Sequence, residues 1–308
     1  MNLTGKVAVV TGGGQGLGLA YAYALARAGA HVVINDIDAE AAEQAVKAVR
    51  AGGGQAVAQV AAVGSSETAD ALVARALDAF GRLDVMVTNA GLPRDRVLWN
   101  MTDEDFDSVI DVHLRATFTC ARAAMRHFRT AGEGGRLILA GSPAGQRGNF
   151  GQTNYAAAKA GIAALARTWA MECAKAQVTV NALIPNAATA MTRSVPFLAP
   201  YVDLLDRGEP IPPGIRRALS FGGPEDCAGL VVFLASDAAS RVTGQCIGIG
   251  GDRLSLWSHP TEIRSSFNDG GWDADTIADS WASGVGEHPE TYGIPVAQLP
   301  ATLQEATG

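Results

Sequence analysis

The chain lacks an excess of positive charge, and it lacks a long apolar run. Its 308 residues carry 24 lysines and arginines against 31 aspartates and glutamates, a net charge of −7. An acidic chain with no basic patch among aromatic residues is not expected to bind nucleic acid or anionic membranes. No apolar run reaches the ~18 residues that span a bilayer. The first strand begins almost at once, which leaves no room for a signal or transit segment, so a cytoplasmic location is expected.

Disulfide and metal patterns are also missing. The four cysteines include no C-x-x-C pair, and they are interpreted as small buried hydrophobic residues in a reducing compartment. The five histidines are scattered along the chain, so no metal site is expected. Apolar residues make up 48% and charged residues 18%, which fits a globular protein with a large buried sheet.

Glycine is plentiful, and it gathers after the first apolar segment. Residues 6–10 form a strand candidate, TGGGQGLG follows at 11–18, and residues 19–29 are helix formers that stop at a glycine. A strand, a glycine-rich turn and a helix N-terminus form an anion site, because backbone N–H groups and the helix dipole favour phosphate. The spacing G-x-x-x-G-x-G differs from the G-x-G-x-x-G dinucleotide fingerprint. The predicted phosphate-binding residues are Gly12, Gln15, Gly16, Leu17 and Gly18.

The second strand candidate, residues 31–35, ends at Asp36. A carboxylate at this place can accept hydrogen bonds from the ribose hydroxyls of NAD, and it would repel the 2′-phosphate of NADP. Neither Gln15 nor Ile37 supplies a basic side chain for that phosphate. The pattern predicts NAD as cofactor. The alternative is that Asp36 only caps the helix that follows.

A tyrosine and a lysine stand four residues apart in YAAAK, residues 155–159. On a helix these positions share one face. A lysine cation beside Tyr155 would lower the pKa of the phenol and make it a general base near neutral pH. The alternative is an exposed pair on an alanine-rich helix.

Strands alternate with helices along the chain, which predicts an α/β fold with a parallel sheet covered by helices on both faces. We expect one Rossmann-type doubly wound domain over residues 1–251. The extension 252–308 is expected to pack on that domain or on a neighbouring subunit. Prolines and glycines break up residues 189–223, which are interpreted as a flap over the substrate or as a surface insertion.

Six segments, in order and spacing, resemble the short-chain dehydrogenase/reductase family over roughly residues 3–251. They are TGGGQGLG (11–18), Asp36, TNAG (88–91), Ser142, YAAAK (155–159) and IPNAAT (184–189). Three strings further resemble the hydroxyacyl-CoA dehydrogenase part of peroxisomal multifunctional enzyme type 2. They are DVHLRATF (111–118), GNFGQTNYAAAKAG (148–161) and IPNAATAMT (184–192).

The resemblance implies roles for particular residues. Tyr155 would exchange a proton with a secondary alcohol or ketone, Lys159 would lower its pKa and hold the nicotinamide ribose, and Ser142 would bond the substrate oxygen. His113 stands where many members have an asparagine that assists a proton relay; the alternative is a packed histidine. Further cofactor contacts implied by the family are Val63, Asn89, Ala90, Gly91, Pro185 and Thr189. The family also implies a homo-oligomer, a tetramer or dimer formed through two long helices.

The substrate is left open by the sequence. Apolar residues in the flap suggest a bulky, lipid-like molecule such as a hydroxyacyl thioester, a steroid or a terpenoid alcohol. Arg147 and Arg193 are candidates to meet a CoA phosphate, although lone arginines are commonly surface groups. Two other functions are weighed: a non-catalytic NAD-binding sensor or scaffold, and a non-redox lyase or dehalogenase on the same frame. The retained glycine loop, Ser142, Tyr155 and Lys159 argue against both.

Overall fold

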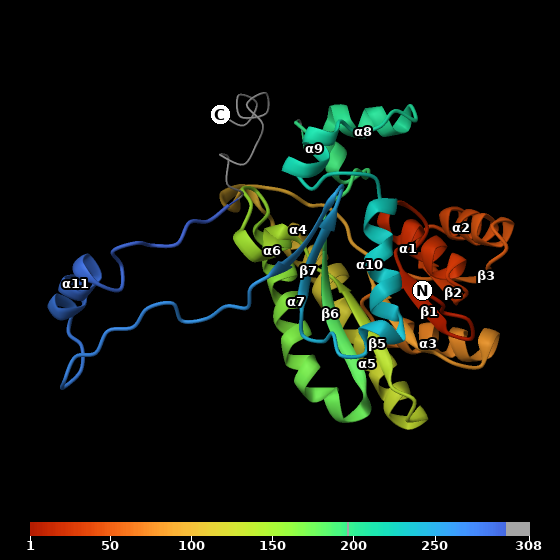
Figure 1. Cartoon of the computed structure of the whole chain (residues 1–308), viewed down its shortest axis with the longest axis horizontal. Coiled ribbons are helices and arrows are strands. Elements are labelled where there is room, and N and C mark those ends of the chain that lie inside the picture. Colours follow the sequence, from red (N-terminus) through yellow and green to blue (C-terminus); the bar gives the residue numbers. More distant parts are fainter. Residues whose placement is uncertain (196, 294–308) are drawn as a thin grey trace.

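A computed structural model describes residues 1–195 and 197–293 of the chain. An eight-stranded sheet forms its centre, with strand order β3-β2-β1-β4-β5-β6-β7-β8 (Figure 1). The first seven strands are parallel and β8 is antiparallel to β7. The predicted Rossmann-type α/β fold is confirmed.

The strands are short, and β1, β2, β4, β5 and β6 are buried along almost their whole length. Their bounds are β1 Val7–Thr11, β2 His31–Asp36, β3 Gln55–Val60, β4 Val85–Thr88, β5 Gly135–Ala140, β6 Val178–Pro185, β7 Cys246–Gly250 and β8 Arg253–Trp257. The α-helices are α1 Gly16–Arg27, α2 Ala39–Ala51, α3 Ser66–Phe80, α4 Asp103–Val109, α5 Ala116–Ala131, α6 Pro143–Arg147, α7 Thr153–Glu172, α8 Ala199–Asp206, α9 Pro213–Ala218, α10 Glu225–Ala235 and α11 Ala274–Ser283.

Helices cover both faces of the sheet, and each face has its own core. One apolar cluster joins the sheet to α1, α2 and α10, and the other joins it to α3, α5 and α7. Because alternate side chains of each strand point to opposite faces, Val10 and Ile34 belong to the first cluster and Val9 and Val33 to the second. This double burial explains the continuous apolar strands in the sequence.

The helical segment from Thr102 to Ala131 is not one continuous α-helix. A capping box between Thr102 and Asp105 begins α4, as its sequence predicts. Residues Ile110–Arg115 then form a π-helical segment before α5 starts at Ala116. The hydroxyl of Thr117, in the first turn of α5, donates to the carbonyl of His113 at 2.7 Å. Such π segments often lie at functional sites, and this one buries His113.

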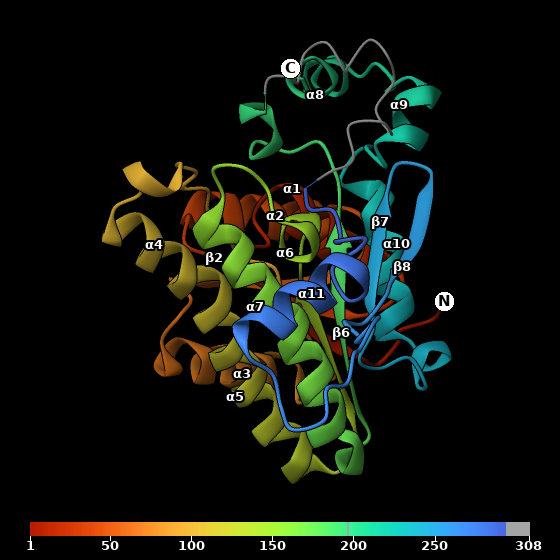
Figure 2. The same ribbon diagram turned by 90° about the vertical axis from the view of Figure 1, so that its left-hand side faces the viewer.

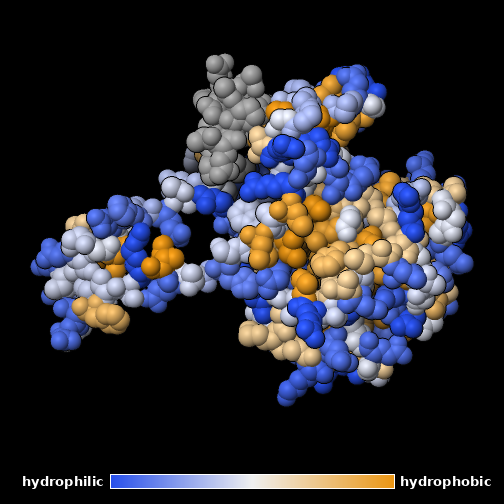
Figure 3. Space-filling model, viewed as in Figure 1, coloured by the Kyte–Doolittle hydropathy of each residue, from blue (hydrophilic) through white to orange (hydrophobic). Residues whose placement is uncertain are grey.

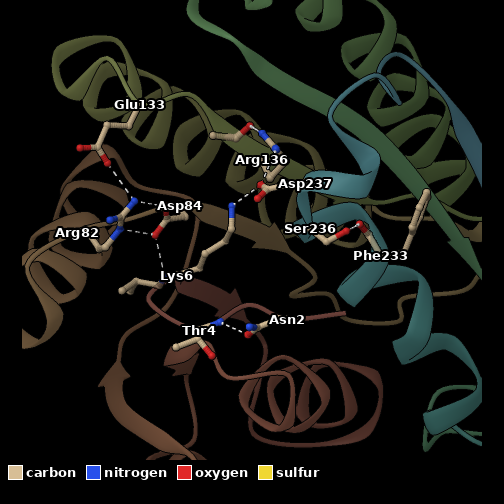
Figure 4. Close-up of polar contacts among 12 residues, drawn as sticks. Asn2, Thr4, Lys6, Arg82, Asp84, Glu133, Arg136, Phe233, Ser236 and Asp237 are labelled. Carbon is tan, nitrogen blue, oxygen red and sulfur yellow. Dashed lines mark hydrogen bonds and ion pairs between the residues drawn. The ribbon is translucent and has the colours of Figure 1, made fainter.

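Ion pairs connect the segments at the amino ends of the strands (Figure 4). Lys6 Nζ lies 2.8 Å from Asp237, and Arg82 lies 2.6 Å from Asp84 and 3.0 Å from Glu133. Asp84 also accepts a hydrogen bond from the backbone N–H of Val7 at 2.8 Å. These contacts stabilise the amino ends of the strands. The loops at the opposite, carboxyl ends are the ones suited to a site.

Residues 189–223, the predicted flap, contain two short helices, α8 and α9, with an apolar cluster of their own that includes Val202, Ile215 and Phe221. Arg216 of α9 ties the flap to the body through ion pairs with Asp226 at 2.9 Å and Asp252 at 2.7 Å. The flap is therefore a small packed unit above the carboxyl ends of the strands.

The C-terminal extension differs from a docked tail in its described part. The sequence did not predict β8, which adds to the edge of the sheet. After β8 the chain leaves the body, and α11 stands away from it on the side of α7 (Figures 1 and 2). The chain returns at Arg147, whose carbonyl accepts from Gly293 N–H at 2.8 Å. Residues 294–308 lie outside the described residues.

Candidate active site

The glycine loop between β1 and α1 has room only for glycine at several positions. Gly12 and Gly16 have φ values of +60° and +53°. A Cβ on Gly12 would lie 2.8 Å from the Cα of Ala90, and one on Gly18 would lie 1.9 Å from the carbonyl oxygen of Gly12. The side chain of Gln15 does not cap α1, so the backbone N–H groups of the first turn are directed at the loop as an anion site.

Asp36 lies beside this loop at the end of β2. Its carboxylate accepts hydrogen bonds from the N–H of Gly14 at 2.9 Å and of Asp38 at 3.1 Å, and the residue is 9% exposed. The helix that follows is capped by Asp38, which accepts from Glu40 and Ala41. The alternative role of Asp36 as a cap is therefore wrong. Each carboxylate oxygen retains lone pairs for a ribose diol.

Asn89 joins the end of β4 to the glycine loop. Its side-chain amide donates to the carbonyl oxygens of Thr11 and Gly12, both at 3.1 Å, and its N–H donates to the hydroxyl of Thr11 at 2.9 Å. Ala90 packs directly on Gly12. Asn89, Ala90 and the loop thus form one wall.

Residues at and after the end of β6 form the other side of the site around the glycine loop. Pro185 ends β6, and the methyl group of Thr189 would lie 3.7 Å from a Cβ placed on Gly16. Val63, in the loop after β3, is half-buried, and Leu17 packs against the core under α1. A cradle that excludes side chains, offers backbone N–H groups and carries a carboxylate at the β2 end fits a nicotinamide dinucleotide. No cluster of three metal-ligating side chains occurs in the described part of the chain.

Ser142, Tyr155 and Lys159 converge beside this cradle. Ser142 is the N-cap of α6, is 8% exposed, and forms a hydrogen bond with Tyr155 that acts on the pKa of the phenol. Lys159 is 4% exposed and donates to the carbonyl oxygen of Ala140 at 2.6 Å. Its Nζ lies 5.5 Å from the centre of the Tyr155 ring. The predicted i,i+4 pair therefore faces inward and is not an exposed helix pair.

The pKa of Tyr155 differs from the expected direction. Burial raises the pKa of the phenol above its usual 10, and the hydrogen bond from Ser142 acts against that rise. Burial also lowers the pKa of Lys159 to about 7. Desolvation disfavours the charged form of both groups, so in the chain alone Lys159 does not produce a phenolate.

His113 reaches the same site from the π-helical segment. Its ring lies edge-on to Tyr155 with 5.2 Å between centroids. Nε2 lies 3.1 Å from the N–H nitrogen and 3.0 Å from the carbonyl oxygen of Leu92, while Nδ1 is buried without a protein partner. Burial, and then the charge of Lys159, lower the pKa of His113 to about 3, so the ring is neutral. A Cβ on Gly91 would lie 2.3 Å from Cε1 of this ring, which explains the glycine.

Two positioning residues escaped the sequence reasoning. Asn154 is fully buried, donates to the carbonyl oxygens of Arg94 and Asp105, and accepts from the N–H of Tyr155 at 2.8 Å. Gly145 leaves space for Lys159, because a Cβ there would lie 2.5 Å from its backbone. The only sequence signal was that Asn154 directly precedes Tyr155.

Three polar residues near the flap have partners within the chain. Arg147 donates to the carbonyl of Gly293 at 2.8 Å and to Thr291. Arg193 is paired with Asp203 and Asp206 of α8. Both arginines considered for a CoA phosphate are thus engaged elsewhere. Asn186 donates to the carbonyl of Leu219 at 2.6 Å and so holds the flap.

The match of residues 6–196 to the short chain dehydrogenase family agrees with this geometry. The chain belongs to that family. It is therefore an oxidoreductase of the kind that acts on hydroxyl and keto groups, and members of this family typically bind nicotinamide cofactors.

Three similar proteins illustrate the range of the family. Hydroxyacyl-CoA dehydrogenase ChsB1 of Mycobacterium tuberculosis is 41% identical over 88% of this chain and 86% of its own length. Peroxisomal multifunctional enzyme type 2 of Mus musculus is 35% identical over all of this chain, which spans 39% of that enzyme. The crystal structure of a short chain dehydrogenase from Mycobacterium avium, 34% identical, superimposes with a TM-score of 0.81 over 96% of this chain and 100% of its own.

Proposed function

We propose that the protein is an NAD-dependent dehydrogenase that interconverts a secondary alcohol and a ketone. The observation that carries the proposal is the convergence of Ser142, Tyr155 and Lys159 beside a side-chain-free cradle that ends at Asp36. When bound, the cofactor supplies hydride acceptance or donation at its nicotinamide ring.

The residues of the chain hold and move the proton. The Tyr155 hydroxyl exchanges a proton with the substrate oxygen, and Ser142 donates a hydrogen bond to the same oxygen. Because burial keeps the pKa of Tyr155 above 10 in the chain alone, its phenol is protonated at neutral pH and is set to donate to a ketone. Lys159, held by Ala140, contributes charge and a donor toward the nicotinamide ribose.

His113 contributes as a neutral ring. Its Nδ1 has no protein partner although it is buried, and a buried polar atom without a partner commonly bonds water. We assign this atom to the water-linked relay that leads from Lys159. Nε2 meanwhile holds Leu92, next to the Asn89–Gly91 wall of the cofactor cradle.

Asp36 supports NAD as the cofactor. It would meet the 2′-phosphate of NADP with like charge, and neither Gln15 nor the 73% exposed Ile37 provides a cation there. Val63, Pro185 and Thr189 complete the proposed contacts with the dinucleotide.

For the substrate, we favour a hydroxyacyl thioester over a steroid or terpenoid alcohol. The flap offers an apolar cluster above the strand ends. One of the similar proteins, ChsB1 of Mycobacterium tuberculosis, is named as a hydroxyacyl-CoA dehydrogenase, which supports this choice. The engaged Arg147 and Arg193 leave recognition of a CoA phosphate to other residues. A cytoplasmic location and a homo-oligomer remain part of the proposal, and no helix in the described ranges is long and apolar enough to cross a membrane.

Formation of the reduced cofactor tests the proposal with matched 3-hydroxyacyl-CoA thioesters and steroid alcohols, each offered with NAD and with NADP at equal concentration. We expect turnover with NAD and the thioester. Tyr155→Phe should bind NAD normally and lose turnover by at least about 10³-fold. Near-normal turnover of Tyr155→Phe would contradict the role of Tyr155 in proton exchange. Equal use of NADP would contradict the role of Asp36 in selecting NAD.

A further inference from the structure

Residues 92–97, here called the strap, run past the start of α7, the helix that carries Tyr155. Four strap residues are each held by a hydrogen bond to a neighbouring element. The pairs are Leu92 with His113, Arg94 with Asn154, Asp95 with Gln152, and Arg96 with Asp105. A parallel β-bridge between Arg96 and Gln152 aligns the strap with the residue just before α7. The strap therefore has a fixed place at the N-terminus of this helix.

The N-terminus of α7 has no acidic residue of its own. Its first turn, which includes Tyr155, contains no aspartate or glutamate, and the side chain of Gln152 does not cap the helix. The aligned peptide dipoles of this 20-residue helix give its N-terminus a partial positive charge. Because a positive charge attracts a phenolate, the helix favours the ionised form of a tyrosine in its first turn.

Asp95 brings a carboxylate to this place from the strap. Its Oδ2 accepts from Nε2 of Gln152 at 2.7 Å, and a neutral amide orients the carboxylate without cancelling its charge. The arginines on either side have other partners, since Arg96 pairs with Asp105 and Arg94 donates to a neighbouring backbone carbonyl. Among the residues that the structure describes, no ion pair includes Asp95. Its negative charge is therefore uncompensated.

The phenol of Tyr155 leans toward this end of the helix, because helical side chains tilt toward the N-terminus. The groups that face it are Lys159 of α7, the neutral ring of His113, Ser142 at the start of α6, and Asp95. Burial raises the pKa of Tyr155 most, the hydrogen bond with Ser142 lowers it, and the charge of Asp95 raises it again. Asp95 thus opposes the ionisation that the helix N-terminus favours.

We propose that Asp95 is a positioning residue that keeps the phenol of Tyr155 protonated by countering the positive N-terminus of α7, so that the site is set to donate a proton to a ketone. This inference rests on the proposed function, in which Tyr155 exchanges a proton with the substrate oxygen. An enzyme does not change the equilibrium between alcohol and ketone. Asp95 instead sets the pH range in which each direction is fast.

The strap is open to solvent, so the effect of this charge depends on salt. Arg94, Asp95 and Arg96 are all exposed. In Figure 3, which has the view of Figure 1, α11 lies away from the body, and the described extension leaves the strap uncovered. The Debye length falls from about 10 Å at 0.1 M salt to about 3 Å at 1 M. A charge effect of Asp95 on Tyr155 therefore weakens at high salt, whereas a purely structural effect does not.

Titration of the Tyr155 phenol in the full-length protein, with and without NAD, tests the proposal in the absence of substrate. Tyrosine isotope-labelled at Cζ gives one NMR signal per tyrosine, and the signal lost in Tyr155→Phe identifies Tyr155. Asp95→Asn removes the charge and keeps an acceptor for Gln152. Asp107→Asn removes an equal charge from the exposed side of α4 and serves as the matched control.

We expect Asp95→Asn to increase the phenolate fraction of Tyr155 at least about twofold, at the highest pH at which the fold is intact. The increase should be larger at about 0.1 M than at about 1 M salt. Asp107→Asn should leave the fraction at its wild-type value. An unchanged or lowered fraction in Asp95→Asn, or an equal increase in Asp107→Asn, would overturn the proposal.

The pH profile of turnover gives a second readout with an alcohol and its ketone. Asp95→Asn should raise kcat/KM for alcohol oxidation about twofold or more on the acidic side of the profile, and lower ketone reduction on the alkaline side. Asp95→Glu, which keeps the charge, should restore the wild-type profile. An equal loss of both directions at every pH would show a structural role and overturn the proposal.

The two readouts separate this inference from the proposed function. Absence of turnover with every alcohol, together with the expected change in the phenol titration, would contradict the proposed function and support the role of Asp95 at Tyr155. Normal turnover with an unmoved pH profile in Asp95→Asn would overturn the role of Asp95 alone.

Discussion

At the scale of single residues, burial sets the chemistry of the candidate site more than neighbouring charge does. Tyr155 and Lys159 stand close, yet desolvation pushes the pKa of the phenol up and that of the amine down to about 7. The sequence could predict the pair because helix periodicity places i and i+4 on one face. It could not predict the pKa directions, because these depend on how much of the body covers the two groups.

Lys159 should make stability depend on pH in the chain without cofactor. Its pKa is about 7 folded and about 10.5 unfolded, so the unfolded chain binds the extra proton between these values. Folding stability therefore rises with pH from about 7 upward. Lys159→Met should remove about 2 kcal/mol of that rise between pH 7 and pH 9, measured as the difference in urea unfolding from the wild type. A wild-type slope retained in the variant would contradict the assignment.

His113 should affect turnover through its neutral ring. We expect His113→Ala to lower kcat by about tenfold or more and to change NAD affinity much less. His113→Asn, with the side chain that many family members have here, should recover part of the lost rate. Because burial holds the pKa of His113 near 3, the ring should give no break in a kcat/KM profile between pH 5 and pH 8. A break in that range lost in His113→Asn would show a titrating histidine instead.

At the scale of elements, local signals located most helices and strands but not their interruptions. Caps at Ser65, Thr102 and Asp38 begin α3, α4 and α2. The π-helical segment 110–115 had no recognised signal, since its reason is tertiary: it buries His113 against Leu92. The prolines predicted a break in regular structure over residues 189–223, and their role as a flap over the substrate stays a prediction. Helices α8 and α9 and their anchor on Arg216 come from packing.

The anchor of the flap can be tested at Arg216. Arg216→Met keeps most of the side-chain volume and removes the ion pairs with Asp226 and Asp252. Both carboxylates are partly exposed, so we expect a loss of only about 1 kcal/mol in global stability. The loosened flap should show faster proteolysis within 189–223 and a several-fold higher KM for a bulky substrate. Proteolysis at the wild-type rate would show that the ion pairs do not hold the flap.

At the scale of the whole molecule, stabilising ion pairs and the candidate site lie at opposite ends of the strands of one sheet. The ion pairs of Arg82 and Lys6 join the amino ends of the strands, whereas Asp36, Asn89 and Ser142 follow the carboxyl ends. Because of this separation, a substitution can change the stability of the fold without changing the candidate site.

Asp84→Ala should lower the free energy of unfolding by about 2 kcal/mol. It leaves Arg82 and the N–H of Val7 without their buried acceptor. The affinity for NAD should stay within about twofold, because the site is at the other edge. Chemical denaturation and a binding titration check both parts. A large loss of NAD affinity at unchanged stability would reverse the assignment of the two edges.

The sequence by itself determined the sheet, the glycine loop, Asp36 and the Ser142–Tyr155–Lys159 order, because these depend on local periodicity, glycine geometry and strand ends. Only the tertiary structure decided the added strand β8, the roles of Asn154 and Gly145, the inward turn of His113 and the position of α11. Those features arise from contacts between segments far apart in the chain, and no local pattern encodes which surfaces meet.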